Sequence, residues 1–535
     1  MTLFHAVGQQ SWLFLVELLI GGFVLYLYLF NIRPATPKIR NLPELPGWRP
    51  FWGHLKQLGS DHSTKLQQLS IKHNIPVFQC LFGNQRIIFI NSYEAANEWF
   101  IKNQSVLKDR PVFYTFHKLV STSQGLTIGT SPWNDECKRR RLNVQRYMTT
   151  PAIQERAGLI DVEVYSLLRD MYRDTQVESC YPYPYTQRLA LNFTTMLCYA
   201  TRFDDIKNSL LEQILSIVRV ISSFRSTNQN FQDFIPFLRF LPENSRRKAA
   251  LHSSKTRDEW LTKLTNEALN HKDSRPSIVG DFAKDTETSR LNLDDVKSIC
   301  VGLVSGGFET VGSTSALIMA QLVSEKGPEW QEKIYNECLA HYSSVQEAWG
   351  KVLLEQKCEF SNSFIRELLR MYAVIPLLPA RKTIKSFTWN GASIPAGETV
   401  ILNAQAANHD KSRFGPTADE FMPERFLNDP DIDVPPYHFT FGAGSRACTA
   451  VNLSVRILYV ILTRTCMAFT VRKDASRQVN TDYIGFAQDR TAQTNWPKDF
   501  GVYLEPRDPK TVDACFSQSK MNCQELLSYS IEYDK

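Results

Sequence analysis

The hydrophobic pattern begins with an apolar run from Trp12 to Phe30, which only Glu17 and two glycines interrupt. At about 1.5 Å per residue, a helix of this length approaches the roughly 30 Å of a bilayer's hydrocarbon core. No lysine or arginine precedes the run, whereas basic residues follow it from Arg33 onward, and this asymmetry places the following chain in the cytosol. A cleaved signal peptide is the alternative, but it would have a basic start and a shorter apolar run. The sequence therefore predicts a single-span membrane anchor over residues 1–32.

The pattern after the anchor predicts one large domain. Residues 33–60 are rich in proline and read as a semi-rigid connector. Two apolar stretches joined by Gly83-Asn84 predict a β-hairpin. Helical periodicity dominates from about residue 90 to 370, short strands and turns follow to about 440, and a last helix is predicted over 452–469. We therefore expect a mainly α-helical domain with small β-sheets over 61–507, and a polar C-terminal tail over 508–535.

Composition excludes several classes of protein. With 43% hydrophobic and 12% aromatic residues among 535, the chain can bury a large core. A net charge of +6 is small for this length and does not indicate nucleic-acid binding. The eleven cysteines form no C-x-x-C pair, which argues against a disulfide framework or zinc module and favours a reducing compartment. No G-x-G-x-x-G fingerprint is found, so electrons for any redox chemistry would come from another protein.

The segment "FTFGAGSRACTA" at 439–450 is the first candidate for chemistry. Gly442 and Gly444 permit a tight turn in which backbone N–H groups converge. Cys448 shortly precedes a predicted helix, whose N-terminal end favours a thiolate, and Arg446 can reach anionic groups beside it. With the aromatic ring of Phe441, the set suits a metal held in an anionic macrocycle. A structural cysteine in a turn is the alternative.

The same segment resembles the haem-binding loop of the cytochrome P450 family, whose pattern is F-x-x-G-x-R-x-C. The matching residues are Phe441, Gly444, Arg446 and Cys448. Ala450 departs from the pattern, because the family commonly has glycine there. The resemblance implies haem b as cofactor, with Cys448 as the ligand of the iron and Arg446 as a partner of a haem propionate.

A second match to the family is the E-x-x-R pair of Glu367 and Arg370. The pair lies on one helix face and can form an ion pair, although such pairs alone are common in helices. In "FMPERF", Arg425 occupies the position that completes the family's buried Glu–Arg–Arg network. The resemblance implies a structural triad behind the haem loop and no catalytic role.

A third match is "SGGFET", in an apolar stretch that carries Glu309 and Thr310 after Gly306-Gly307. Burying an acid or a hydroxyl without a partner costs free energy, so their presence needs a reason. Helix-cap chemistry or a satisfied core threonine is the alternative. The stretch resembles the family's (A/G)-G-x-(D/E)-T signature, which implies that Thr310 and Glu309 are catalytic and deliver protons for cleavage of the O–O bond.

Two further arginines match propionate-binding positions of the family. Arg381 follows the E-x-x-R helix in "LLPARKTI". In "SPWNDECKRRRLNVQRYM" the family's W-x-x-x-R pattern fits in two registers, one with Trp133 and the other with Cys137 in place of tryptophan. The second register places Arg141 at the propionate and is preferred. The other basic residues of this helix could be a solvated face, but in the family they lie where an acidic reductase docks.

The substrate pocket is the least determined part of the site. By analogy with the family, the loop "PVFYTFHKLVSTSQGLTI" lines it, and Phe113, Tyr114 and Phe116 would suit an aromatic ring. Aromatic residues in loops also pack without binding ligands. No arginine can be singled out as the partner of a substrate carboxylate.

The resemblance extends over about residues 33–505, plus the anchor. It is closest to filamentous-fungal members related to phenylacetate hydroxylases and to enzymes of secondary metabolism. It implies a haem-thiolate monooxygenase that hydroxylates a small organic substrate, aromatic or amino-acid-derived, with O₂. Electrons would come from NADPH through a separate flavoprotein, NADPH–cytochrome P450 reductase, with cytochrome b5 as an additional donor.

The expected setting is the endoplasmic reticulum membrane, with one span, the catalytic domain in the cytosol, lipid around the anchor, and a monomeric chain. Two other functions remain open from sequence. A haem-thiolate isomerase or dehydratase would keep the fold, but such enzymes often lack the acid–threonine pair found at Glu309-Thr310. A non-catalytic haem-binding membrane protein is the other alternative.

Overall fold

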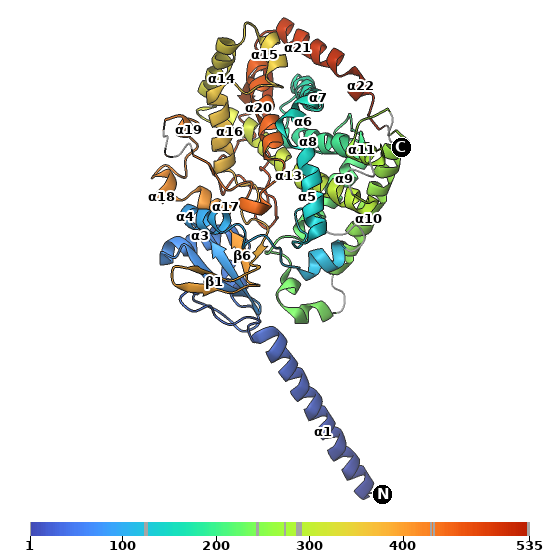
Figure 1. Ribbon diagram of the computed structural model, residues 1–535, viewed down its shortest axis with the longest axis vertical. Coiled ribbons are helices and arrows are strands. Elements are labelled where there is room, and N and C mark those ends of the chain that lie inside the picture. The colour runs from blue at the N-terminus through green and yellow to red at the C-terminus, as the bar shows by residue number, and fades with distance from the viewer. Residues whose placement is uncertain are drawn as a thin grey trace.

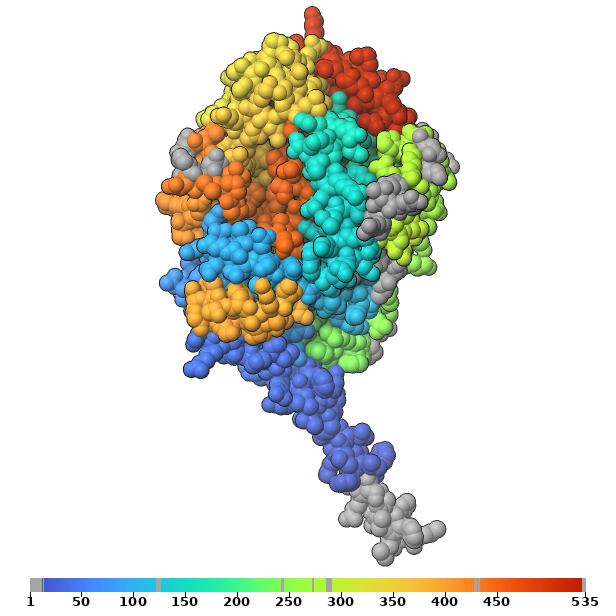
Figure 2. Space-filling model, in the orientation of Figure 1, coloured from blue at the N-terminus to red at the C-terminus, as the bar shows by residue number. Residues whose placement is uncertain are grey.

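The structure is a computed structural model that describes residues 2–121, 127–241, 245–271, 274–284, 291–428, 431 and 434–531. A long N-terminal helix, α1 (Thr2–Leu27), stands clear of a body of helices and small sheets (Figure 1). The space-filling view shows the same N-terminal segment projecting from an otherwise rounded body (Figure 2). The expected mainly α-helical class with small sheets is confirmed.

The projecting segment fits a membrane anchor. Residues Phe14–Ile32 are long and apolar enough to cross a bilayer, and nearly all of them are exposed. The helix α20 (Val451–Ala468) passes the same test of length and composition, but it is mostly buried in the body. The base of α1 touches the body where the rings of Phe23 and Phe237 meet edge to face at 6.1 Å.

The largest sheet lies at the end of the body next to α1 (Figure 1). Its strands are, in spatial order, β1 (Val77–Phe82), β2 (Gln85–Ile90), β6 (Thr399–Leu402) and β3 (Arg381–Lys382). The first two form the antiparallel hairpin that Gly83-Asn84 predicts, and Gly83 has a φ of 56°. Because β6 pairs parallel to β2 and antiparallel to β3, the chain around 380–402 lies beside the N-terminal hairpin.

The proline-rich residues 33–60 belong to this sheet region instead of forming a separate connector. Leu42, Leu45 and Leu55 are buried against it. The Gln79 side chain of β1 donates hydrogen bonds to the carbonyls of Ile39 at 2.8 Å and Leu42 at 2.6 Å. Proline prevents regular structure here but does not prevent packing, so the connector is part of the folded body.

The centre of the body is α13 (Leu293–Leu322), which packs along α8 (Pro182–Tyr199). A capping box starts α13: the Asn292 side chain accepts from the Asp295 N–H, and the Asp295 carboxylate accepts from the Asn292 N–H. At Gly312 a Cβ would come within 3.2 Å of the Gln187 Cα, so glycine permits the close approach of α8.

The remaining helices surround this pair. The longer ones are α3 (His62–His73), α5 (Asp135–Tyr147), α7 (Ala157–Thr175), α9 (Ser209–Ser223), α10 (Ser245–Asn270), α14 (Gly327–His341) and α16 (Glu359–Met371). The shorter ones are α2 (Leu55–Leu58), α4 (Tyr93–Asn97), α6 (Thr150–Glu155), α11 (Ile278–Lys284), α15 (Val345–Lys351), α17 (Ala404–Asn408), α18 (Lys411–Phe414) and α19 (Arg425–Asn428). Two further sheets each pair two antiparallel strands: β4 (Phe387–Trp389) with β5 (Ala392–Ile394), and β7 (Phe469–Lys473) with β8 (Val502–Pro506).

The C-terminal residues are not a free polar tail. Helices α21 (Pro509–Asn522) and α22 (Gln524–Leu527) lie at the end of the body opposite α1 (Figure 1). Val512, Cys515 and Ser519 share one face of α21 and are buried. The Trp349 indole donates to the Ser519 hydroxyl at 2.8 Å. The part of the polar segment 508–535 that the structure describes is therefore helical, and its three buried positions leave the overall composition polar.

Candidate active site

The cysteine segment, the middle of α13 and the chain after α16 enclose a cavity of about 340 Å³. Cys448, Thr310, Glu309 and Arg381 all line it, although they are far apart in sequence. Most of the wall is apolar, and a smaller part of it is polar. This combination is typical of a ligand or cofactor site.

The cysteine segment forms the tight turn that its glycines predict. Gly442 and Gly444 have φ values of 69° and 63°. A Cβ on Gly444 would also lie 2.1 Å from the Phe100 carbonyl oxygen, so only glycine fits there. Phe441 lines the cavity and packs against the His438 ring at 5.8 Å. The Ala450 N–H, immediately before α20, donates to the Cys448 sulfur at 3.4 Å.

Cys448 differs from the other cysteines in its surroundings. It is exposed, whereas the other ten are buried. Because Cys448 lines the cavity, its exposed surface faces an enclosed space, and burial raises the pKa of its thiol above the ordinary value. The Ala450 N–H and Arg141 act in the opposite direction. A metal ion at the sulfur would supply the missing stabilisation of the thiolate.

The other ligands of such a metal would not come from protein side chains. Within the described ranges, no group of three or more His, Cys, Asp or Glu residues could hold a metal ion. A single thiolate facing an apolar cavity instead suits the iron of a haem, whose porphyrin would supply the other ligands. The donor set of the cavity therefore fits haem.

Five arginines line the same cavity, and four of them form a group: Arg110, Arg141, Arg381 and Arg446. Each of these four donates to main-chain carbonyls, for example Arg381 to Ala443 at 2.9 Å and Arg141 to Ala447 at 2.9 Å. Burial and then mutual repulsion lower the pKa of Arg381 to about 9. The Nε atoms of Arg110 and Arg446 are buried without a partner. A cluster of cations with spare donors fits the two carboxylates of haem.

Arg110 is the member of this cluster that the sequence did not reveal. It precedes a proline in "KDRPVF" and belongs to no periodic pattern. Burial lowers its pKa well below the ordinary value, and Arg381 and Arg446 add to the effect. Trp133 and Cys137 do not line the cavity, so neither alternative for the tryptophan position contributes to its wall. The Trp133 ring instead lies 5.8 Å from the Arg446 guanidinium carbon.

Thr310 and Glu309 lie in the middle of α13. The Thr310 hydroxyl lines the cavity and donates to the Gly306 carbonyl at 2.9 Å. A Cβ on Gly306 would meet nothing within 4 Å, so this turn of the helix leaves space beside the hydroxyl. Burial raises the pKa of Glu309 to about 7. Hydrogen bonds from Ser222 and Thr494 and the charge of Arg225 lower this pKa and offset part of the effect of burial. An acid that exchanges its proton near neutrality thus lies next to a cavity-facing hydroxyl.

The raised pKa of Glu309 predicts a titration near pH 7. Below that pH the buried carboxyl is neutral. Because its folded pKa exceeds the ordinary 4.5, its contribution to stability is largest below about pH 4.5 and is lost as the pH rises through about 7. We expect infrared spectra of the wild type to show a protonated carboxyl band that disappears around pH 7. Glu309→Gln should lack this band, and a band that survives the substitution would assign the titration to another acid.

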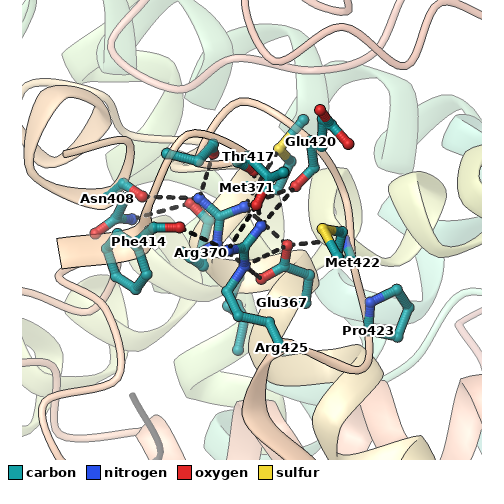
Figure 3. A network of polar contacts seen from close by, with 12 residues as sticks. Glu367, Arg370, Met371, Asn408, Phe414, Thr417, Glu420, Met422, Pro423 and Arg425 are labelled. Carbon is teal, nitrogen blue, oxygen red and sulfur yellow. Dashed lines mark hydrogen bonds and ion pairs between the residues drawn. The ribbon is translucent and has the colours of Figure 1, made fainter. Parts of the chain in front are cut away.

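The triad predicted from the E-x-x-R motif is present and fully formed (Figure 3). The Arg370 Nε and Nη2 atoms donate to the Glu367 carboxylate at 2.7 and 2.8 Å, and Arg425 Nε lies 3.3 Å from it. Arg370 also donates to the carbonyls of Asn408 and Ala418. Glu367 and Arg370 are completely buried. The network ties α16 to the chain before the cysteine segment and does not line the cavity.

Removing the carboxylate of this triad should destabilise the fold. Glu367→Gln leaves two buried guanidinium groups without a counter-charge, which costs about 3–5 kcal/mol of unfolding free energy. Urea denaturation followed by tryptophan fluorescence measures the change. Glu424→Gln is the control, because Glu424 pairs with Lys333 on the surface and such a pair contributes about 0–1 kcal/mol. Equal losses in both variants would rule out a dominant role for the triad.

Two of the three predicted substrate residues line the cavity. Phe113 and Phe116 do so, whereas Tyr114 does not. Tyr114 is the first residue of the helical segment Tyr114–Val120. Its ring lies 4.7 Å from the Arg239 guanidinium carbon. Tyr114 is therefore removed from the candidate substrate residues.

Comparisons with known proteins agree with this geometry. The family model described as Cytochrome P450 matches residues 43–491. Phenylacetate 2-hydroxylase of Emericella nidulans is 38% identical, over 94% of this chain and 97% of its own length. From the same organism, 3-hydroxyphenylacetate 6-hydroxylase is 31% identical, over 88% of this chain and 91% of its own. A cytochrome P450 monooxygenase of Mycosarcoma maydis is also 31% identical, over 90% of this chain and 89% of its own.

Proposed function

The chain belongs to the cytochrome P450 family, and on that premise we propose that it hydroxylates a small aromatic substrate. It is a haem-thiolate monooxygenase, which uses haem iron with a cysteine thiolate ligand and electrons from a redox partner. Such an enzyme places one oxygen atom of O₂ in the substrate and releases the other as water. Aromatic substrates are supported by Phe113 and Phe116 in the cavity wall and by two relatives named as hydroxylases of phenylacetates.

The roles of the site residues are part of this proposal. Cys448 would ligate the iron, and Arg141, Arg381 and Arg446 would pair with the propionates, together with Arg110. When bound, the haem supplies activation of O₂, which electron donation from the thiolate assists. Gly444 and Phe441 shape the turn that presents the sulfur.

Thr310 and Glu309 would supply the protons. The Glu309 carboxyl holds a proton up to about pH 7, and it neighbours the cavity-lining hydroxyl along α13. The Thr310 oxygen can accept a hydrogen bond from water while it donates to the Gly306 carbonyl. A water held there would pass protons from Glu309 into the cavity.

The cellular setting follows the anchor. We propose a single-pass membrane protein with its catalytic domain in the cytosol, because α1 is apolar, exposed and followed by basic residues. The endoplasmic reticulum as the membrane and a monomeric chain are further parts of the proposal. Electrons would come from NADPH–cytochrome P450 reductase, with cytochrome b5 as an additional donor. A role of the product in secondary metabolism stays a prediction.

The observation that carries the proposal is the thiol of Cys448 facing an apolar cavity ringed by arginines. The test is the absorption spectrum of the reduced, CO-bound full-length protein, followed by turnover with reductase, NADPH and isotopically labelled O₂. We expect the Soret band of thiolate-ligated iron and one labelled oxygen in a hydroxylated product. Without that band the assignment fails. With the band but without labelled product from any aromatic compound, the substrate class fails.

A further inference from the structure

One basic side chain in the cavity has no role in the site described above. Arg225 follows α9 and lines the cavity beside Glu309 and Ser305 of α13. It lies in the segment "FRSTNQNF" between α9 and α10, and none of the four grouped arginines is among the charges that act on it. Burial lowers its pKa to about 10, so its guanidinium is still charged at neutral pH.

The guanidinium of Arg225 is poorly satisfied. Its Nε is buried without a partner. Its one hydrogen bond to a described residue runs from Nη2 to the Ser305 hydroxyl at 3.5 Å, which is long for such a bond. Its guanidinium carbon lies 4.6 Å from the centre of the Phe116 ring. By contrast, Arg381 donates to two main-chain carbonyls at 3.0 and 2.9 Å.

Glu309 is the neighbouring acid whose charge acts on Arg225, and it offsets only part of the effect of burial on the Arg225 pKa. Glu309 makes no ion pair with Arg225, and its own pKa of about 7 leaves it neutral for much of the time at neutral pH. His117 is held neutral: its Nδ1 accepts from the Phe113 N–H at 2.9 Å, so its Nε2 donates to the Thr130 carbonyl. Since burying an unpaired cation is costly, the site is suited to an anion from outside the chain.

The surroundings of Arg225 indicate what the anion is attached to. The guanidinium borders the apolar cavity at Phe116, and Phe113 lines the wall nearby in sequence. Ser305 adds a hydroxyl that can donate to a carboxylate oxygen. A guanidinium presents two parallel N–H groups that match a carboxylate.

We propose that Arg225 binds the carboxylate of the substrate, which is accordingly a small aryl carboxylic acid whose ring lies in the aromatic part of the cavity. Arg225 is a specificity-determining residue in this assignment and takes no part in proton transfer. The proposal rests on the proposed function, because it assigns a substrate to the same cavity.

The test is binding of matched acids and amides to the full-length haem protein. Phenylacetate, 3-phenylpropionate and indole-3-acetate are compared with their primary amides, which keep the shape and lose the charge. Equilibrium dialysis gives each Kd, and the Soret shift reports whether the ligand reaches the haem. We expect the wild type to bind at least one acid about 10-fold or more tightly than its amide.

Arg225→Gln should raise the Kd of that acid by about 10–100-fold and leave the Kd of its amide within about 3-fold. Arg225→Lys should give an intermediate Kd, because a lysine keeps the charge but not the paired donors. Arg219→Gln is the matched control: Arg219 is an exposed arginine of α9 over the Trp496 ring, and its loss should leave every Kd within about 3-fold.

Two results would overturn the proposal. One is a wild type that prefers none of the acids over their amides, and the other is an Arg225→Gln variant that keeps the preference. Both results count only for protein that shows the CO spectrum of thiolate-ligated iron. This requirement distinguishes them from failure of the proposed function. A wild type without the thiolate spectrum would reject the proposed function, while dialysis would still report whether Arg225 binds the acid.

Discussion

Replacing Cys448 with alanine should abolish both the CO spectrum of thiolate-ligated iron and monooxygenase turnover. No other cysteine lines the cavity, so no other thiolate can take its place. The loss should exceed the roughly 10–100-fold that follows from removing an outer-shell partner of a metal ligand. The measurements are the reduced CO difference spectrum, haem content and product formation with reductase and NADPH.

The control for this prediction is Cys466→Ala. Cys466 belongs to α20, the helix that follows the cysteine segment, and it is buried away from the cavity. This variant should keep the spectrum and most of the activity. If Cys448→Ala kept a thiolate spectrum, another residue would be the iron ligand, and the assignment of Cys448 to that role would be wrong.

The parts of the site that the sequence predicted are those that depend on neighbours in the chain. Gly442 and Gly444 define the tight turn before Cys448. The Cys448 sulfur accepts a hydrogen bond from the N–H of Ala450, only two residues later. The ion pair of Glu367 and Arg370 needs only helical spacing. The segment containing Thr310 is helical throughout, as its apolar pattern indicates. Local geometry determines such features, so a motif is enough to find them.

The parts that the sequence did not predict depend on long-range packing. Arg110 enters the cavity because the chain around it lies against Ala380, which is 270 residues away in sequence and whose carbonyl accepts a hydrogen bond from Arg110 at 2.8 Å. The sequence does not distinguish Arg225 from other arginines in helical regions. Its unsatisfied Nε is recognised only from the structure. The C-terminal helix α21 was missed for a similar reason: its buried face is set by α7 and Trp349.

Thr310→Ala should separate electron use from product formation. The variant keeps Cys448 and the arginines, so the CO spectrum and substrate binding should persist. It loses the cavity-lining hydroxyl that directly follows Glu309 in α13, and with it the site that would hold a proton-carrying water. We expect product per NADPH to fall by on the order of 10²-fold, the lower end of what a positioned proton donor contributes. The missing electrons should appear as hydrogen peroxide.

The controls decide whether the hydroxyl itself matters. Thr310→Ser restores an oxygen at the same place and should recover most of the coupling. Thr314→Ala removes a hydroxyl one turn further on, which donates to the Thr310 carbonyl at 2.8 Å, and it should leave coupling near that of the wild type. NADPH oxidation, peroxide and product are measured in the same reaction. Full coupling in Thr310→Ala would contradict the proton-transfer role of this hydroxyl.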